Sequence, residues 1–244
     1  MVWGKGVSFL YLCPMSSPYL LCLETATGVC SVLLAQGTKV LAERTSTESR
    51  EHAAMLAVYI DEVLKEAGLK ASSLDAVVVS KGPGSYTGLR IGVATAKGIC
   101  YTLQKKLIAI DTPLAMASCY LYHHPGLEMN TVLMPMIDAR RMEVYGAALD
   151  TSLQYLEPIR AEILTPGSFV QPLLRPHIVF GDAAMKSVEV FKSQSFVKVD
   201  TDFNLSARGL LYPGLHAWSK DQFEDVAYFE PYYLKEFVAK VKQH

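Results

Sequence analysis

A glycine-rich run carries the densest group of residues that could do chemistry in this chain. It reads Gly82-Pro-Gly-Ser-Tyr-Thr-Gly88 and follows the apolar segment Ala76–Val79. A strand, a glycine-rich turn and a helix can present backbone N–H groups to an anion at the helix N-terminus. Gly84 and Ser85 would then hold a phosphate, with Arg90 one turn into the helix. The run is not a Walker motif, since the Gly-Lys-Ser/Thr ending is missing.

The residues that follow the run favour a different use. The helix continues with Gly88, Gly92, Ala96 and Gly98. Glycine inside a helix costs about 1 kcal/mol relative to alanine, and phosphate binding needs glycines in the loop rather than along the helix. Small residues spaced along a helix let another helix approach closely. We therefore favour helix docking, between subunits, over phosphate binding.

Polar side chains also stand at the end of the first predicted strand. Glu24 and Thr25 would face a metal-bound water and a phosphate if this strand ended at a nucleotide cleft. The alternative, which we favour, is that Thr25 and Thr27 cap a tight hairpin, as Ser and Thr often do.

Two later turns have the same ambiguity. Asp138 and Arg140 lie in a charged hairpin after a buried strand, and Gly181-Asp182 ends another strand. Each turn is suited either to lining a cleft or to forming a solvated turn with weak local ion pairs. Both interpretations stay open on spacing alone.

Metal and thiol chemistry are not indicated by the spacing. The chain has five cysteines and no Cys-x-x-Cys pair, which is typical of free thiols in a reducing cytosol. It has no His-x-x-x-His motif, because His52 is followed at the fourth position by Leu56. The sequence also shows no readable Ser/His/Asp arrangement for a peptidase.

Composition sets further limits. The chain has 244 residues, half of them hydrophobic, and a net charge of −1. This is enough apolar material for one sizeable core or two modest ones. Strong, independent nucleic-acid binding usually needs a basic excess, so it is disfavoured. No apolar run reaches the roughly 18–20 residues that span a membrane.

Periodicity predicts an ordered series of elements. Apolar residues at helical spacing predict a helix over Ser49–Ala67, and small residues a second over Gly88–Lys105. Pro113 suits the first turn of a later helix. Strands are predicted over the following segments: Leu20–Glu24, Cys30–Ala35, Val40–Glu43, Leu74–Ser80, Leu107–Ile110, Val132–Ile137, Glu143–Leu149 and Ile178–Asp182.

Three strands, a helix, a strand, a helix and a strand match one half of the actin, sugar kinase and Hsp70 ATPase (ASKHA) fold. We therefore predict an α/β fold of two lobes, each a mixed sheet with flanking helices, the second lobe reduced. Residues 19–111 would form the first lobe and 112–244 the second, whose late helix would pack back on the first. Residues 1–18 are predicted to be a non-native or disordered extension, with Met15 as the natural start.

Several motifs together resemble one family. They are Ser49-Arg-Glu-His-Ala, Ser80-Lys-Gly-Pro-Gly-Ser-Tyr-Thr-Gly-Leu-Arg-Ile-Gly, Asp138-Ala-Arg-Arg-Met-Glu-Val-Tyr, Gly181-Asp and Glu230-Pro-Tyr-Tyr-Leu234. This set resembles the bacterial TsaB (YeaZ) proteins from about Leu20 to Tyr233. It departs from the common pattern at Glu24, usually Asp, and at Tyr86, often Phe.

The resemblance implies a cytoplasmic, non-catalytic subunit of the tRNA threonylcarbamoyl transferase complex. Such proteins resemble the catalytic subunit TsaD, were once labelled glycoprotease-like, and support threonylcarbamoyladenosine formation next to the anticodon. It implies a heterodimer with TsaD, joined by the ATPase TsaE, and a homodimer in isolation. tRNA would be reached only through the complex, with no membrane contact. No metal or cofactor is implied, and weak ATP or ADP binding stays open.

The resemblance assigns the partner contact to the two helices of the first lobe. The expected contact residues are His52, Leu56, Tyr59, Ile60, Tyr86, Arg90, Gly92 and Ala96. A vestigial nucleotide cleft would comprise Glu24, Thr25, Gly84, Ser85, Asp138, Arg140, Gly181 and Asp182. The alternative function is an active nucleotide-dependent kinase or ATPase of the same fold, using Glu24, Thr25, Arg90 and Asp138 around Mg-ATP.

Overall fold

The first of two sheets is built from the N-terminal half of the chain. A computed structural model describes residues 17–46, 52–170 and 175–235. The sheet has the strand order β3-β2-β1-β4-β5, with β1–β3 antiparallel and β4 and β5 parallel to β1. Its strands are β1 (Tyr19–Glu24), β2 (Cys30–Gln36), β3 (Lys39–Ser46), β4 (Ala76–Gly82) and β5 (Lys106–Asp111).

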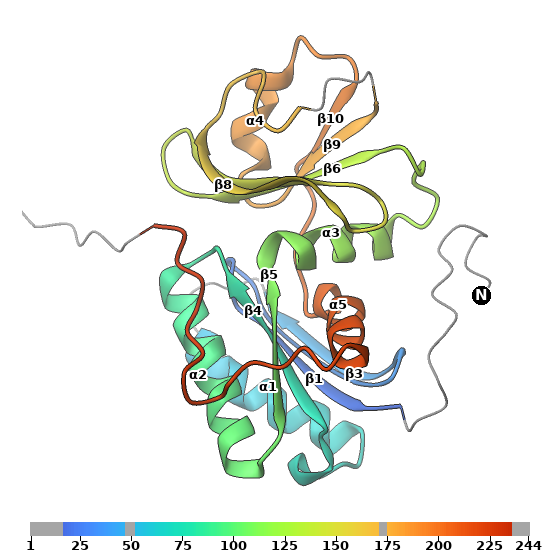
Figure 1. Ribbon diagram of the computed structural model, residues 1–244, viewed down its shortest axis with the longest axis vertical. Coiled ribbons are helices and arrows are strands. Elements are labelled where there is room, and N and C mark those ends of the chain that lie inside the picture. Colours follow the sequence, from blue (N-terminus) through green and yellow to red (C-terminus); the bar gives the residue numbers. More distant parts are fainter. Residues whose placement is uncertain (1–16, 47–51, 171–174, 236–244) are drawn as a thin grey trace, which may run out of the picture.

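Helices cover both faces of this sheet (Figure 1). Along β1, Leu21 and Leu23 pack toward α1 (His52–Glu66) and α2 (Tyr86–Leu103). The alternate side chains pack toward α3 (Thr112–His123) and α5 (Arg208–Ser219) on the other face. Burial on both faces explains why β1 and β4 are almost continuously apolar. A short 3-10 turn at Ala71–Ser73 precedes β4.

The second sheet is smaller and follows α3. Its strand order is β10-β9-β6-β7-β8, with one helix of its own, α4 (Ala184–Phe191). In Figure 1, α3 lies between the two sheets, and one apolar cluster joins its residues to both. The strands are β6 (Val132–Asp138), β7 (Glu143–Leu149), β8 (Tyr155–Ile163), β9 (His177–Phe180) and β10 (Val197–Asp200).

The predicted fold class is confirmed, namely two mixed sheets with flanking helices. Residues 1–16, which include Met15, and the Ser49 end of the first predicted helix lie outside the described residues. The sequence pattern did not predict β8, α4 or β10, and the late helix expected to pack on the first lobe, here α5, was given no residue bounds. Pro158 and partly exposed side chains obscure β8, and Pro213 with two glycines obscures α5.

The last described segment, residues 220–235, is named here the C-terminal strap. Its backbone bonds to the edge strand β5, where Glu224 N–H donates to Leu107 O at 2.8 Å. Farther along, Lys97 of α2 donates to the carbonyl oxygens of Ala227 and Phe229 at 3.2 and 2.7 Å. The strap therefore crosses α2 (Figure 1) and covers part of the free edge of the first sheet.

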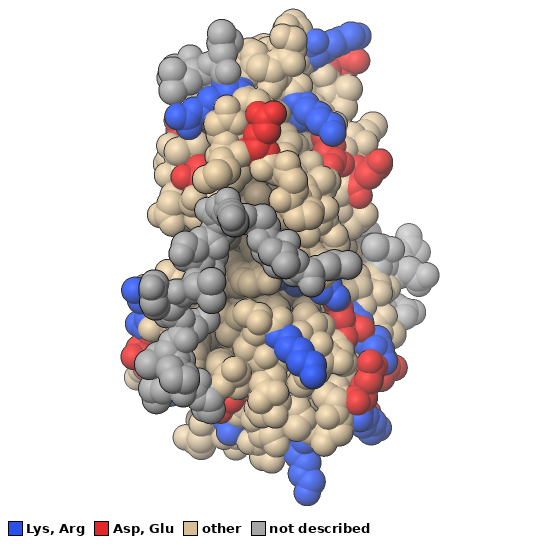
Figure 2. All heavy atoms as spheres, turned by 90° about the vertical axis from the view of Figure 1, so that its right-hand side faces the viewer, with Lys and Arg blue, Asp and Glu red and all other residues tan. Residues whose placement is uncertain are grey.

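Charges on the described surface are mixed. On the face in Figure 2, Lys and Arg alternate with Asp and Glu among uncharged residues, and the described part of that face shows no continuous basic area. Within the described ranges, no helix is both long and apolar enough to cross a bilayer.

Candidate functional site

The turn after β1 is locked to the glycine-rich run. Ser85 N–H donates to Ala26 O at 2.7 Å, and the Thr25 hydroxyl donates to Gly88 O at 2.8 Å. The N-cap of α2 is Ser85, whose Oγ accepts from Gly88 N–H at 3.2 Å. The group held against this helix N-terminus is therefore the chain's own Glu24–Thr27 turn.

The glycines of α2 are needed for this contact. A Cβ atom on Gly88 would lie 2.0 Å from Thr25 O, and one on Gly92 would lie 2.3 Å from Thr25 Oγ1. Both distances are well inside van der Waals contact. The small residues on this side of α2 thus let the helix approach its own sheet.

This geometry corrects three of the predicted contact residues. Gly92, Ala96 and Leu56 are buried inside the first lobe, so their side chains do not face a partner. The prediction that Gly92 and Ala96 admit a helix of another subunit was wrong, because both face the interior of their own lobe. Residue spacing shows that a close neighbour is needed but does not show which one. His52 begins α1, but its side chain lies outside the described residues.

The outward face of α1 and α2 keeps the other predicted contact residues. Tyr59 and Ile60 are half-buried on α1, and Arg90 is exposed on α2. The Arg90 guanidinium lies 4.6 Å from the centre of the Tyr86 ring, which lies 5.1 Å from that of Tyr233 in the strap. Exposed apolar residues extend this face, chiefly Val58 and Tyr101, which are 46% and 72% exposed.

Glu24 is fully buried and uses both carboxylate oxygens inside the turn. One oxygen accepts from Ala26 N–H at 2.7 Å and the other from the Ser80 hydroxyl. Burial raises the pKa of Glu24 to about 7, although these hydrogen bonds lower it in part. The structure thus corrects the interpretation of Glu24 as a cleft residue: its carboxyl holds the turn together.

A cavity of about 210 Å³ lies between the two lobes. Thr27 and Gly28 line it from the first lobe, and Gly181 and Asp182 from the second. Of the eight residues expected in a vestigial nucleotide cleft, Gly181 and Asp182 line this cavity. Glu24, Thr25, Gly84, Ser85, Asp138 and Arg140 are not among its lining residues. Thr201, Phe203 and Asn204 do line it, although no sequence signal marked them.

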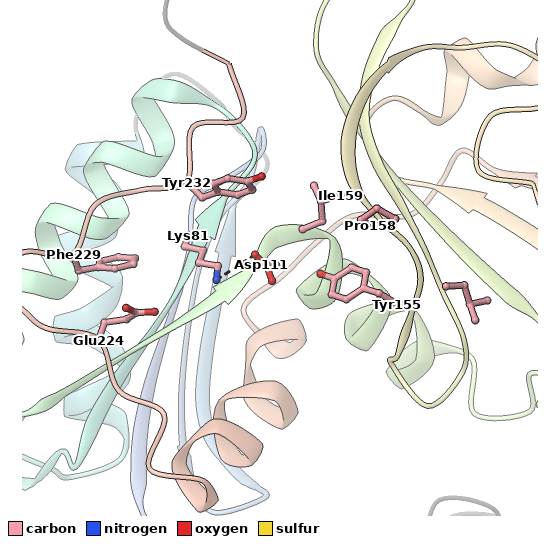
Figure 3. A pocket seen from close by; sticks show the side chains of 9 residues that line it. Lys81, Asp111, Tyr155, Pro158, Ile159, Glu224, Phe229 and Tyr232 are labelled. Carbon is pink, nitrogen blue, oxygen red and sulfur yellow. Dashed lines mark ion pairs between the residues drawn. The ribbon is translucent and has the colours of Figure 1, made fainter.

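A larger pocket of about 740 Å³ opens beside the strap (Figure 3). Lys81 and Asp111 form an ion pair at its base, 3.4 Å apart. In Figure 3, Tyr155 from β8 points toward Asp111, and Tyr232 of the strap lies on the other side of the opening. Burial raises the pKa of Tyr155, and the nearby Asp111 raises it further. Four segments that are distant in the sequence form this pocket, namely β4, β5, β8 and the strap, so no local motif could predict it.

Metal-binding side chains do not gather in the described residues. Within those ranges, no group of three His, Cys, Asp or Glu could hold a metal ion. Four of the cysteines are buried free thiols. Burial raises the pKa of Cys30 and of Cys100 to about 11, so both remain protonated and unreactive near neutral pH.

Comparison with known proteins identifies the family. The sequence profile described as TsaD, tRNA N6-adenosine threonylcarbamoyltransferase, matches residues 39–241. The chain belongs to the TsaD family. The resemblance to its TsaB (YeaZ) members is also confirmed, by relatives that carry the TsaB name and by a solved YeaZ structure.

These relatives cover different shares of the chain. The Haemophilus influenzae TsaB biosynthesis protein is 36% identical over 136 residues, which is 54% of this chain and 53% of that one. The Escherichia coli TsaB protein is 32% identical, with 52% and 53% covered. The chain thus spans about half the length of these curated relatives. YeaZ from Pseudomonas aeruginosa, at 26% identity, has a TM-score of 0.76, covering 89% of this chain and 100% of that one.

Substituting the glycine at the α2 N-terminus tests the locked turn. Gly88→Ala should lower the free energy of unfolding by about 2 kcal/mol or more, because the new methyl group would meet Thr25 O. Gly98→Ala in the same helix is the matched control, since nothing lies within 4 Å of its Cβ position. It should raise stability by up to about 1 kcal/mol. Equal denaturant midpoints for the two variants would contradict the packing argument.

The buried carboxyl predicts a pH dependence of stability. Because the pKa of Glu24 rises from its ordinary 4.5 to about 7 on folding, the unfolded chain ionises first as the pH rises. The contribution of Glu24 to the free energy of unfolding is fully present below pH 4.5 and is lost as the pH rises toward 7. Relative to that of Glu24→Gln, the free energy of unfolding of the wild type should fall by roughly 3 kcal/mol between pH 4 and pH 8. Urea unfolding of both proteins at both pH values measures this change. A stability difference between wild type and variant that is the same at pH 4 and pH 8 would refute it.

Proposed function

We propose that this protein acts in tRNA threonylcarbamoyladenosine biosynthesis as a non-catalytic subunit that binds TsaD. Membership of the TsaD family and the TsaB names of its relatives support the pathway. The observation that carries the non-catalytic role is the packing of the Glu24–Thr27 turn. Glu24 is fully buried, and the Thr25 carbonyl oxygen occupies the space beside Gly88. The missing His-x-x-x-His pair at His52 and Leu56 supports it as well.

The docking surface in this proposal is the outward face of α1 and α2. The helices have 15 and 18 residues, so they are about 22 and 27 Å long. Val58, Tyr101 and the half-buried Tyr59 provide apolar area, and Arg90 provides a charge. Apolar and aromatic anchors with an arginine are typical of the central part of protein interfaces.

The remaining partners follow from the family resemblance. In isolation the same face would pair with a second copy, and in the cell TsaE would join the TsaD heterodimer. tRNA would be reached through this complex, in the cytoplasm. The protein would need no cofactor of its own, and weak ATP or ADP binding would be incidental to its role.

The second candidate function is a nucleotide-dependent kinase or ATPase. The cavity between the lobes favours it, because it joins Thr27 and Asp182 where this fold would hold a nucleotide. Its volume of about 210 Å³ is small beside the roughly 300–1,000 Å³ usual for ligand sites. Calorimetry of the isolated chain with Mg-ATP separates the two functions: micromolar binding with turnover would favour the enzyme.

A charge placed on the docking surface should break the heterodimer. Val58→Glu should weaken TsaD binding at least tenfold, because it would bury an unpaired carboxylate. Ile163→Glu is the matched control, since Ile163 is an exposed aliphatic residue on the second sheet. Titration calorimetry measures both affinities. Equal affinities for Val58→Glu and wild type would place the interface elsewhere.

A further inference from the structure

The hairpin between β6 and β7 displays two arginines that the proposed function has not used. Arg140 and Arg141 occupy its tip, and both are exposed. Among the ion pairs found within the described ranges, none includes either guanidinium. Two adjacent positive charges are thus presented to solvent, and no ion pair to another described residue neutralises them.

The backbone at this tip is held in an unusual conformation. Arg140 and Arg141 have φ values of +74° and +50°, in the left-handed region that favours glycine. Two long side chains in such a turn are strained, and strain of this kind collects at functional sites. The conformation places both exposed arginines at the end of a tight turn.

The base of the hairpin is braced. Asp138 Oδ1 accepts from Arg140 N–H and from Lys186 Nζ, both at 2.5 Å, and Asp138 N–H donates to Asp182 Oδ1 at 2.9 Å. Lys235 of the strap forms an ion pair with Glu143 on the other side. The acids Asp138 and Glu143 are therefore paired with lysines, and these bonds fix the backbone turn that carries the two exposed arginines.

We propose that this arginine hairpin, Asp138–Glu143, contacts the phosphate backbone of tRNA bound to the complex. Arginine's planar fork matches phosphate oxygens in a bidentate manner, and a preorganised pair loses little entropy on binding. The inference rests on the proposed function, since it names how this subunit meets the substrate.

The contact explains how a chain with a net charge of −1 can share in RNA binding. Two phosphate contacts alone are too few for independent affinity, but they add to those of a partner. An acidic protein surface is the competing occupant. It would make the hairpin part of the subunit interface and would show itself as a loss of heterodimer affinity.

The test replaces both arginines with glycine, Arg140→Gly/Arg141→Gly, in the full chain bound to TsaD. Fluorescence anisotropy with a labelled tRNA transcript should show roughly tenfold weaker binding at 0.1 M salt, and the slope of log affinity against log salt should fall by about 1.5. Glycine relieves the left-handed strain, so the variant should melt no lower than wild type. Lower RNA affinity with unreduced stability is not expected of a purely structural hairpin.

Two controls keep the outcomes distinct. Lys39→Ala/Lys198→Ala removes the same charge from exposed positions on other strands and should leave the salt slope nearly unchanged. Arg140→Lys/Arg141→Lys should keep most of the slope. A loss of affinity under threefold in the glycine variant, or weakened TsaD binding in its place, would overturn the inference. If the wild-type complex binds no tRNA at all, the proposed function itself fails.

Discussion

The contact between the Glu24–Thr27 turn and the start of α2 is the constraint on which the first lobe depends. A buried carboxyl, two hydroxyls and two glycines interlock there without leaving room for another group. The same contact sets how closely α2 approaches the sheet. It thereby sets which residues of that helix turn outward. The space that a phosphate would occupy in a nucleotide-binding lobe is used here for internal packing.

This arrangement links the interior of the lobe to its surface. With Gly88 and Gly92 facing inward, Arg90 and Tyr101 face outward from the same helix. The strap fastens to α2 through Lys97 and ends in an ion pair with Glu143 of the second sheet. The outward face of α2, the strap and the arginine hairpin are thus connected along one side of the molecule, and this is the side that we propose meets partners.

Much of the fold could be predicted because the apolar pattern of each element is strong. The continuous apolar strand before Gly82 and the heptad-like stripe of α1 are local signals, and both correspond to elements of the structure. The late helix, α5, was expected but could not be located, because Gly209, Pro213 and Gly214 disrupt its pattern. Those residues are explained only by its neighbours: a Cβ atom on Gly209 would lie 2.2 Å from Ala115 O of α3.

The candidate site was predicted less completely, for a related reason. Residue types indicated that Gly92 requires a close neighbour, but its neighbour, Thr25, lies 67 positions earlier in the sequence. The pockets beside the strap and between the lobes join segments that no spacing rule connects. Polar strand ends such as Gly181-Asp182 were found because the ends of neighbouring strands meet at one edge of a sheet.

The most direct test of the account is hydrogen–deuterium exchange of this chain, alone and with TsaD. Amides in α1 and in the outward turns of α2 should become protected on complex formation, while those around Gly181 and Asn204 should not change. Added Mg-ATP should leave the protection of α1 and α2 unchanged. Protection on TsaD binding that is confined to the cavity between the lobes would contradict a binding role for the helices.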